Sequence, residues 1–483
     1  MEPTEDDVRR FAASFQRFAE AMAQHAHGER VPPIRALIDE HLGRDTSMIP
    51  ILSETFSSWD QVNVQVAVTA WLAGEGRSHE LVGLTGQQRH YSSMSDMLDT
   101  AQWAGVRVGP VDLVNLPVGP HETLACIQFG LFLIDDAGSR FAVLMRGPSQ
   151  HAESPSVVLE VLAADHDLGR AFLQSVRDLT VELNVFRGQV VSFGESEMGH
   201  YGIGPIVFFD RPEVGRGELV LADGVLEAVE RQVLTVARER DRLRSSGQHI
   251  KRGLLLHGPP GTGKTLTVRY LMTVARDHTV VLLTGRGLHM VRPAVALARL
   301  LQPSLVVLED VDLVAEERGM HPGYSNPVLY DVLNVMDGID EDADVAFLLT
   351  TNRADLLEPA LAARPGRVDL AVEIVLPDAV ARRRLIELYG RGLDLRLEDA
   401  DRIVERTSGV TASFVKELMR KAAVLAAVQT AGEGRLTVTD ANVHAALDEL
   451  LAEESALTRV LLGGEVRTHR RPGTEWMMPP EED

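Results

Sequence analysis

The feature that most constrains this chain is a glycine-rich octapeptide that directly follows a short apolar run. Leu254–Leu256 has the composition of a buried strand, the octapeptide GPPGTGKT occupies residues 258–265, and Leu266–Ala275 has helical apolar spacing. Strand, glycine loop and helix in this order are the setting of a phosphate-binding loop, because glycines allow successive backbone N–H groups to turn toward phosphate oxygens. The sequence therefore predicts an α/β fold with a P-loop in a parallel sheet.

The residues of this loop have separate predicted roles. We expect Lys264 to contact the β- and γ-phosphates and the Thr265 hydroxyl to bind Mg²⁺, while the helix N-terminus adds positive potential. The predicted nucleotide-binding residues are Gly258, Pro259, Pro260, Gly261, Thr262, Gly263, Lys264 and Thr265. The alternative is an ordinary Gly/Pro-rich turn, but all eight residues fit the motif in the right setting.

Two carboxylates follow a second buried strand. Leu305–Leu308 is apolar and is followed by Glu309 and Asp310, so a parallel strand would deliver both acids to the carboxyl edge of the sheet, where open α/β sheets bind ligands. One acid would hold the Mg²⁺ bound by Thr265 and the other would polarise the attacking water. A strand followed by a solvated acidic turn is the alternative.

An asparagine and two arginines complete the candidate catalytic set. Asn352 ends the predicted buried strand Ala346–Asn352, where its amide can orient the water or the γ-phosphate; a strand-terminating cap is the alternative. Arg364 and Arg367 lie on an Arg-Pro-Gly-Arg turn. Guanidinium groups bind phosphate in bidentate geometry and suit phosphoryl transfer. A surface turn with salt bridges is the alternative.

The first part of the chain is predicted to form an α+β domain without a recognisable catalytic motif. Ile34–Leu42 and Leu168–Leu183 are expected to be helices. Leu124–Ile134 and Phe141–Met145 flank an Asp-Asp-Ala-Gly turn and predict a hairpin, and the alternation of Val62–Val68 predicts a half-buried strand.

The rest of the chain is predicted to contain a helix before the P-loop domain's first strand and a helical module after its sheet. A single helix is expected over Gly224–Arg244, before the P-loop strand, and an all-α module follows the sheet. The expected helices of that module are Ala381–Gly390, Leu397–Arg406, Ala412–Thr430 and Thr439–Glu454. The predicted domains are 1–200 (α+β, binding a client or partner), 201–378 (the P-loop domain), 379–455 (helical lid) and 456–483 (flexible tail).

Charge and cysteine content narrow the class of protein. The net charge of −22 argues against a protein whose main function is to bind the phosphate backbone of nucleic acids. The single cysteine, Cys126, excludes a disulfide framework within one chain and fits a reducing, cytoplasmic location. No apolar run of about 18 residues predicts a membrane span. The sequence contains no His-Glu-x-x-His zinc-protease motif.

Taken together, the order of these motifs resembles that of an AAA+ ATPase of the AAA subgroup, over roughly residues 210–455. GPPGTGKT is similar to its Walker A motif, LVVLEDVD to Walker B, LLTTNR to the sensor-1 strand and RPGRVD to the arginine-finger segment. The resemblance implies a P-loop AAA+ domain with a helical lid that hydrolyses ATP with Mg²⁺. It also implies a homo-oligomeric ring, a hexamer or heptamer, that remodels or translocates a protein client.

Carried over by position, the resemblance assigns Glu309 to the Mg²⁺ side, Asp310 to the catalytic base, and Arg364 or Arg367 to the finger that reaches the neighbouring subunit. The acid order Glu-Asp is inverted relative to most relatives, and Thr284–Pro303 is short and lacks an aromatic pore-loop residue. Both features are similar to the mitochondrial AAA translocase that moves the folded Rieske protein. The sensor-2 position falls on Ser413.

Two other functions stay open at this stage. The inverted acids also fit an ATP-dependent switch or scaffold with slow turnover. A DNA-acting AAA+ loader is the third reading, and the acidic charge balance argues against it.

Overall fold

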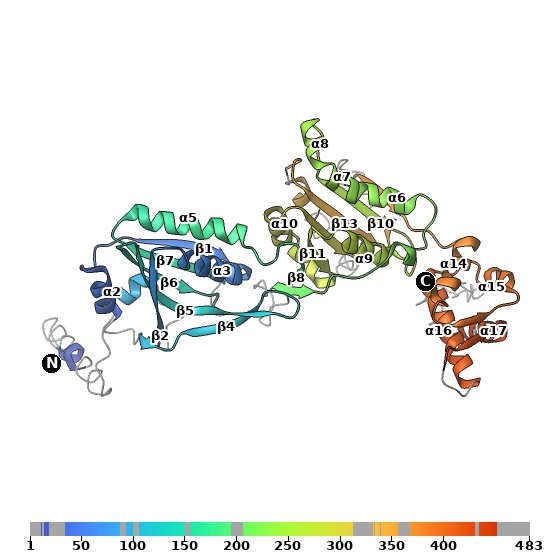
Figure 1. Ribbon diagram of the computed structural model, residues 1–483, viewed down its shortest axis with the longest axis horizontal. Coiled ribbons are helices and arrows are strands. Elements are labelled where there is room, and N and C mark those ends of the chain that lie inside the picture. The colour runs from blue at the N-terminus through green and yellow to red at the C-terminus, as the bar shows by residue number, and fades with distance from the viewer. Residues whose placement is uncertain are drawn as a thin grey trace, which may run out of the picture. The chain divides into compact units, whose positions relative to one another are not determined.

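The computed structural model describes residues 11, 14–18, 34–86, 93–99, 106–149, 155–194, 206–312, 332, 334–338, 340–355, 368–429 and 434–451. The chain forms two compact units, which we describe one at a time (Figure 1). The first comprises Met1–Asp210, His278–Val281 and Ala296–Leu301, and the second comprises Arg211–Asp277, Leu282–Val295 and Gln302–Asp483. None of the helices in the described ranges is long and apolar enough to cross a bilayer.

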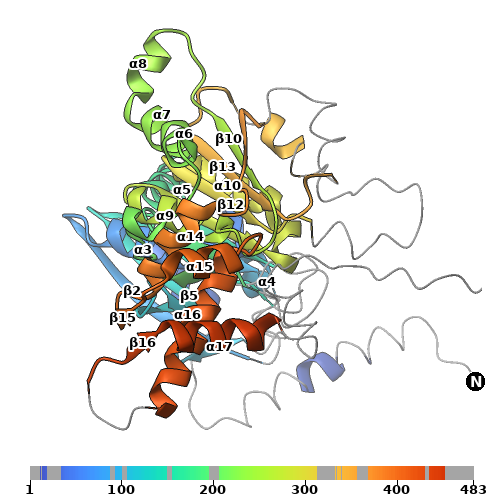
Figure 2. The ribbon, with the colours of Figure 1, turned by 90° about the vertical axis from the view of Figure 1, so that its right-hand side faces the viewer.

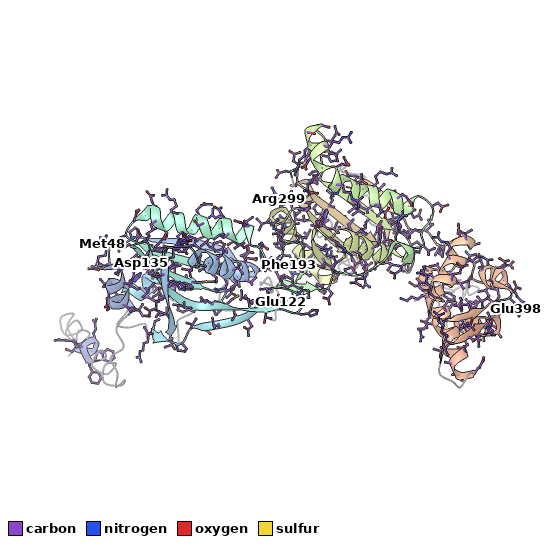
Figure 3. The ribbon with its side chains drawn as sticks, in the orientation of Figure 1. Met48, Glu122, Asp135, Phe193, Arg299 and Glu398 are labelled. Carbon is purple, nitrogen blue, oxygen red and sulfur yellow. The ribbon has the colours of Figure 1, made fainter. Side chains whose placement is uncertain are left out.

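The first unit is built on an antiparallel sheet of seven strands. In spatial order these are β1 (Ile51–Ser57), β7 (Ser156–Ala163), β6 (Ser139–Arg146), β5 (Thr123–Asp136), β2 (Arg77–Thr85) and β3 (Arg107–Gly109), with β4 (Asp112–Pro117) also paired to β5. The predicted hairpin is confirmed as β5–β6. Its turn places Ala137 and Gly138 at positive φ, and the Asp135 carboxylate, labelled in Figure 3, accepts a hydrogen bond from the Gly138 N–H.

Helices cover both faces of this sheet. Helices α3 (Gln61–Leu72) and α5 (His166–Glu182) pack on one face, and α2 (Ile34–Leu42) and α4 (Met94–Asp99) pack on the other. The strands alternate accordingly: Phe132 belongs to the α3/α5 core, whereas its neighbour Leu131 belongs to the α2/α4 core. The unit is therefore a three-layer α+β fold.

The prediction of a strand at Val62–Val68 is wrong, because these residues lie in α3. The alternation suggested that the polar residues between the valines face water. Asn63 is instead buried, and its Oδ1 accepts a hydrogen bond from the Val185 N–H at 2.9 Å. The Gln65 Oε1 likewise accepts from the Ile127 N–H at 2.9 Å. Tertiary hydrogen bonds thus satisfy the polar positions that the pattern assigned to solvent.

The last strands of the first unit are β8 (Val190–Phe193) and β9 (Ile206–Phe209), which are antiparallel. Strand β8 also pairs in parallel with Val280 and Val281, at the start of β11 (Thr279–Thr284). The Trp59 and Phe193 rings meet edge to face in this unit, with centroids 5.6 Å apart.

The second unit contains the parallel sheet that the sequence predicts. Its strand order is β14 (Leu370–Glu373), β10 (Arg252–His257), β13 (Val345–Thr351), β12 (Ser304–Glu309) and β11, and the pairs β10–β13, β10–β14 and β12–β13 are parallel. Helix α9 (Lys264–Val274) belongs to this unit, as does the first half of α10 (Val291–Leu300). This α/β arrangement, with the P-loop after a central strand, confirms the predicted fold class.

The segment before the P-loop strand differs from the prediction of one helix over Gly224–Arg244. It is divided into α6 (Val225–Glu230), a π-helical turn at Arg231–Thr235, α7 (Val236–Arg238) and α8 (Arg240–Ser245). The Glu239 backbone, at φ −96° and ψ 12°, separates the last two helices.

The C-terminal part of the second unit contains α14 (Ala379–Tyr389), α15 (Ala400–Arg406), α16 (Ala412–Gln429) and α17 (Asp440–Leu451) around one apolar core (Figure 2). The predicted all-α character is wrong in one respect. Strands β15 (Asp394–Arg396) and β16 (Thr437–Thr439) pair in parallel beside the helices. Each strand has three residues, which is too short for a periodic signal in the sequence.

Candidate nucleotide site

The glycine loop between β10 and α9 has a backbone that only glycine tolerates at two critical positions. Gly258 has φ 137°, and a Cβ there would lie 2.4 Å from the carbonyl oxygen of Ile374. Gly263, immediately before α9, has φ 115°. The glycines of the motif are therefore required by positive φ and by the close approach of a neighbouring strand end.

Lys264 is the first residue of α9, and its ammonium group lies within the loop. Its Nζ donates hydrogen bonds to the carbonyl oxygens of Gly258 and Pro259, each at 2.8 Å, and the residue is 5% exposed. Burial lowers the pKa of Lys264, and the charges of Asp310 and Asp312 oppose that shift. A cation held at a helix N-terminus, facing two carboxylates, is arranged to bind phosphate oxygens.

Glu309 is the last residue of the strand β12 and Asp310 follows it directly, as predicted. Burial raises the pKa of both carboxyl groups; the charge of Asp310 adds to the effect on Glu309, and that of Asp312 adds to the effect on Asp310. A hydrogen bond with the Thr265 side chain opposes the shift at Glu309. The structure thus brings together the two residues that the sequence predicts as Mg²⁺ ligands.

Asp310 has a strained backbone. Its φ is 50°, which is uncommon for a residue with a side chain, and its N–H donates to the Thr350 Oγ1 at 2.9 Å. The Asn352 Nδ2 lies 3.4 Å from the Asp310 Oδ1 and donates a hydrogen bond to it. The predicted base and the predicted orienting amide are therefore direct neighbours.

Asp312 has a positioning role that the sequence reasoning missed. Its carboxylate, which is 4% exposed, accepts hydrogen bonds from the Thr351 hydroxyl at 2.9 Å and from the Asn352 N–H at 3.1 Å. It thereby ties the end of β13 to the residues after β12. The available signal was a third acid, two residues after Asp310, at the end of an apolar strand.

Lys264, Asp310 and Asn352 line one cavity of about 520 Å³, a size that suits a nucleotide. Part of its lining comes from the glycine loop, helix α9 and the residues after β12 and β13: Pro260–Leu266, Arg269, Asp310 and Asn352. The rest of the lining contains the apolar side chains of Leu219, Val220, Leu221, Leu385 and Ala412 together with Glu218, Tyr389, Ser413 and Lys416, and we call this group of residues the apolar end. Of this lining the sequence analysis named Pro260–Thr265, Asp310, Asn352 and Ser413, but neither the apolar residues nor Arg269 and Lys416.

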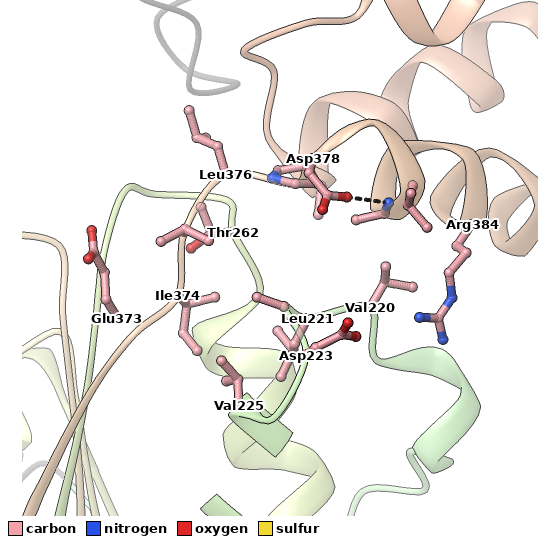
Figure 4. A pocket seen from close by; sticks show the side chains of 16 residues that line it. Val220, Leu221, Asp223, Val225, Thr262, Glu373, Ile374, Leu376, Asp378 and Arg384 are labelled. Atoms are coloured by element: carbon pink, nitrogen blue, oxygen red, sulfur yellow. Dashed lines mark hydrogen bonds between the residues drawn. The ribbon is translucent and has the colours of Figure 1, made fainter. Parts of the chain in front are cut away.

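A second cavity, of about 190 Å³, shares Val220, Leu221, Thr262 and Ala412 with the first (Figure 4). Its lining contains neither Lys264 nor Asp310, so it lacks both the buried cation and the acid that follows β12.

Not every predicted site residue can be placed. Arg364 and Arg367 lie outside the described residues. Asp369, which follows them, is anchored to β10 because its carboxylate accepts a hydrogen bond from the Gly253 N–H at 2.7 Å. The Ser413 N–H donates to the Gly261 carbonyl oxygen at 3.0 Å, so the start of α16 contacts the glycine loop directly.

Comparison with known proteins agrees with this geometry. Residues 254–376 match the model of the ATPase family associated with various cellular activities (AAA). Over 231 residues, 46% of this chain, the sequence is 36% identical to the ATP-dependent zinc metalloprotease FtsH 2 of Sphaerobacter thermophilus, of which it covers 35%. Over 304 residues, 60% of the chain, it is 30% identical to FtsH 3 of the same organism, of which it covers 59%.

A third relative is the ATP-dependent zinc metalloprotease FtsH 3 of Synechocystis sp., which is 32% identical over 243 residues, covering 48% of this chain and 39% of the relative. The chain thus spans less than two thirds of the length of each of these relatives. The glycine loop, the strand-end acids and the family match lead to one conclusion: residues 254–376 form a domain of the AAA ATPase type.

Proposed function

We propose that the protein binds ATP with Mg²⁺ in the 520 Å³ cavity and couples its hydrolysis to the remodelling or translocation of a protein client. The observation that supports this most directly is that Lys264, Asp310 and Asn352, from three different elements, line the same cavity. The apolar side chains in the rest of the lining, which include Leu221 and Leu385, suit a flat, uncharged base.

Thr265 and Glu309 fit a Mg²⁺ ion in this proposal. A hydroxyl and a carboxylate at hydrogen-bonding distance of each other supply the hard oxygen ligands that Mg²⁺ prefers. The bound ion would neutralise charge on the β- and γ-phosphates. Lys264, held at the loop by two carbonyl oxygens, adds a second positive charge on the same oxygens.

Asp310 is the proposed general base. Its raised pKa makes it a stronger proton acceptor than an ordinary aspartate, and Asn352 beside it can orient the attacking water. The water oxygen attacks the γ-phosphorus, Asp310 takes the proton, and the bond from the γ-phosphorus to the bridging oxygen breaks. The products are ADP and phosphate.

The larger assembly is also part of the proposal. We infer a homo-oligomeric ring of six or seven subunits in which Arg364 or Arg367 of one subunit reaches the γ-phosphate of the next. Residues 1–200 would bind the client and 379–455 would act as the lid. The inverted Glu309-Asp310 pair and the short Thr284–Pro303 segment support a translocase like that of the Rieske protein over a peptide-threading machine. The single cysteine supports a reducing compartment such as the cytoplasm.

The named relatives are zinc metalloproteases, but we do not extend zinc proteolysis to this chain. The sequence has no His-Glu-x-x-His motif, which would supply two zinc ligands and a general base. The ATPase domain is the part for which the likeness supports a shared activity.

A mixing experiment tests the ring. Asp310→Asn removes the base but leaves both arginines, whereas Arg364→Ala/Arg367→Ala removes the arginines but leaves the base. Each variant alone is expected to be inactive, and mixing them should restore part of the ATPase activity, because an intact base in one subunit then meets intact arginines from its neighbour. Arg396→Ala, an exposed lid arginine paired with Asp394, is the matched control and should stay active.

The ring proposal is abandoned if mixing at high concentration restores nothing and light scattering shows a monomer. The inverted acid order favours a second function, an ATP-dependent switch with slow turnover, since Asp310 reaches about one methylene less far than a glutamate. Wild-type turnover equal to that of Lys264→Ala, despite tight ATP binding, would establish the switch.

A further inference from the structure

We propose that Tyr270, Glu230 and Arg216 are positioning residues that hold the apolar end of the nucleotide cavity in place and thereby set its affinity for the base of the nucleotide. None of the three lines the cavity. They act on Glu218–Leu221, the segment that does. The inference rests on the proposed function of this site and assigns to it a determinant of base binding.

The chain that leads to the cavity runs along the P-loop helix α9 in the opposite direction. We call residues 211–221 the strap. Its first residue, Arg211, lies at the C-terminal end of α9, where its Nη1 donates to the Met272 carbonyl oxygen at 2.6 Å and to that of Ala275 at 3.2 Å. These bonds satisfy carbonyl groups that the helix leaves without partners.

Further contacts follow toward the N-terminal end of α9. The Val214 N–H donates to the Thr273 Oγ1 at 3.1 Å, and the Thr273 hydroxyl donates to the Pro212 carbonyl oxygen at 2.7 Å. At the other end of the strap, Leu221 is the side chain nearest to where a Cβ on Gly263 would lie, at 3.9 Å. The strap is thus fixed at the C-terminal end of the helix and reaches the phosphate-binding loop at the other.

Between these ends, one hydrogen-bonded network ties the strap to the middle of α9. The Tyr270 hydroxyl donates to the Glu230 carboxylate, which also accepts from Arg216 Nε at 3.2 Å and Nη2 at 3.3 Å. Arg216 Nη2 donates to Glu227 at 2.8 Å as well. Burial, together with Glu230, raises the pKa of Tyr270 to about 12, so its hydroxyl remains a donor at neutral pH.

Arg216 is connected to the cavity wall through a short 3₁₀ turn, Arg216–Glu218. The Gly215 N–H donates to the Glu218 Oε1 at 2.8 Å, and the Leu219 N–H donates to the Arg216 carbonyl oxygen at 3.3 Å. The turn therefore transmits the position of Arg216 to Glu218–Leu221. Val220 in that segment packs against the apolar core of the lid, and Figure 4 shows Val220 and Leu221 beside Thr262 and the lid helix.

This arrangement separates the two ends of the nucleotide. The phosphate end depends on Lys264, Thr262 and Asp310, which the network does not touch. The apolar end depends on a strap whose central anchor is the network. Loss of the network should therefore weaken the binding of a whole nucleotide but not the binding of its phosphate chain alone.

The test measures the dissociation constants of Mg-ATP and of Mg-tripolyphosphate by calorimetry, on the full chain. For Tyr270→Phe and for Arg216→Ala we expect the Kd of ATP to rise roughly threefold to tenfold, since each loses one or two hydrogen bonds, some to a charged group. The Kd of tripolyphosphate should stay unchanged, and KM for ATP should rise while kcat is retained. Glu230→Gln keeps an acceptor for Tyr270 and should be less affected than Glu230→Ala.

Two controls separate the possible failures. Arg420→Ala removes a comparable exposed ion pair, with Glu417 on α16, and should bind both ligands like the wild type. Lys264→Ala should lose affinity for both ligands. If Lys264→Ala binds ATP normally, the proposed function itself is wrong. If it does not, and Tyr270→Phe and Arg216→Ala retain the wild-type Kd or weaken both ligands equally, the positioning role is wrong.

Discussion

Each unit of the molecule contains an aspartate that is partly buried beside an asparagine. In the first unit the Asn63 Nδ2 donates to the Asp60 Oδ1 at 3.1 Å, and in the second the Asn352 Nδ2 donates to the Asp310 Oδ1 at 3.4 Å. Burial raises the pKa of both aspartates, that of Asp60 to about 6. By this measure alone the two pairs look alike.

Their surroundings differ. The Asn63 Oδ1 is already occupied by the Val185 N–H, so the first pair joins two segments of a packed unit. Asp310 has a strained backbone and lines a cavity together with a lysine. A raised carboxyl pKa therefore does not identify a reactive site by itself. Strain, a nearby cation and room for a ligand are needed with it.

The largest expected difference between the two pairs is in turnover. Asp310→Asn should lower kcat by about 10²- to 10³-fold, because the general base is lost, while ATP still binds. Asp60→Asn should leave kcat unchanged. Steady-state ATPase assays and ATP-binding isotherms on both variants measure this contrast. Equal turnover in the two would remove the distinction between them.

The next effect is on stability, and it is expected in the first unit. The pKa of Asp60 is raised from 3.8 to about 6, so the folded state binds a proton more tightly than the unfolded one, and stability falls as pH rises through this interval. Asparagine cannot ionise. At about 1.4 kcal/mol per pH unit, Asp60→Asn should therefore stabilise the first unit at pH 7.5 by at most about 3 kcal/mol, and the gain should vanish near pH 4.

Denaturant unfolding followed by tryptophan fluorescence measures this prediction, because Trp59 is the neighbour of Asp60 and Trp71 lies in the core of the same unit. A variant that is less stable than the wild type at pH 7.5 would contradict the assigned cause of the shift.

The smallest effects come from the asparagines. Asn352→Ala should lower kcat by about tenfold with little change in stability, since it orients a reacting group. Asn63→Ala should leave kcat unchanged but destabilise the first unit by about 1–3 kcal/mol, because the Val185 N–H loses its acceptor. Parallel ATPase and unfolding measurements on both variants would sharpen the comparison. A loss of ATPase activity in Asn63→Ala would contradict this contrast, because the first pair would then contribute to the reaction as well.

Much of the second unit could be predicted because its constraints are local in sequence. The P-loop requires glycine at fixed positions, and Glu309, Asp310 and Asn352 follow apolar strands whose carboxyl ends meet at one edge of the sheet. The apolar end of the cavity could not be predicted in this way. Leu221, Leu385 and Ala412 are far apart along the chain, and only the fold brings them together.

The first unit shows the limit of periodicity more clearly. The alternation at Val62–Val68 gave the wrong element, because Asn63 and Gln65 bond to backbone N–H groups from distant segments instead of facing water. The hairpin β5–β6 was predictable, since its short turn contains Gly138, which readily adopts the positive φ that the turn needs. Sequence patterns thus succeed where the backbone itself is restricted, and fail where tertiary partners decide.

The close approach at Gly258 has a mechanical consequence. The loop touches the Ile374 backbone, which lies just before the lid, and through Gly261 it is bonded to Ser413 at the start of a lid helix. A displacement of the loop would therefore act on the chain at two places, the segment before α14 and the first turn of α16. Gly258 and Gly261 of the glycine loop thus contact both of these segments directly.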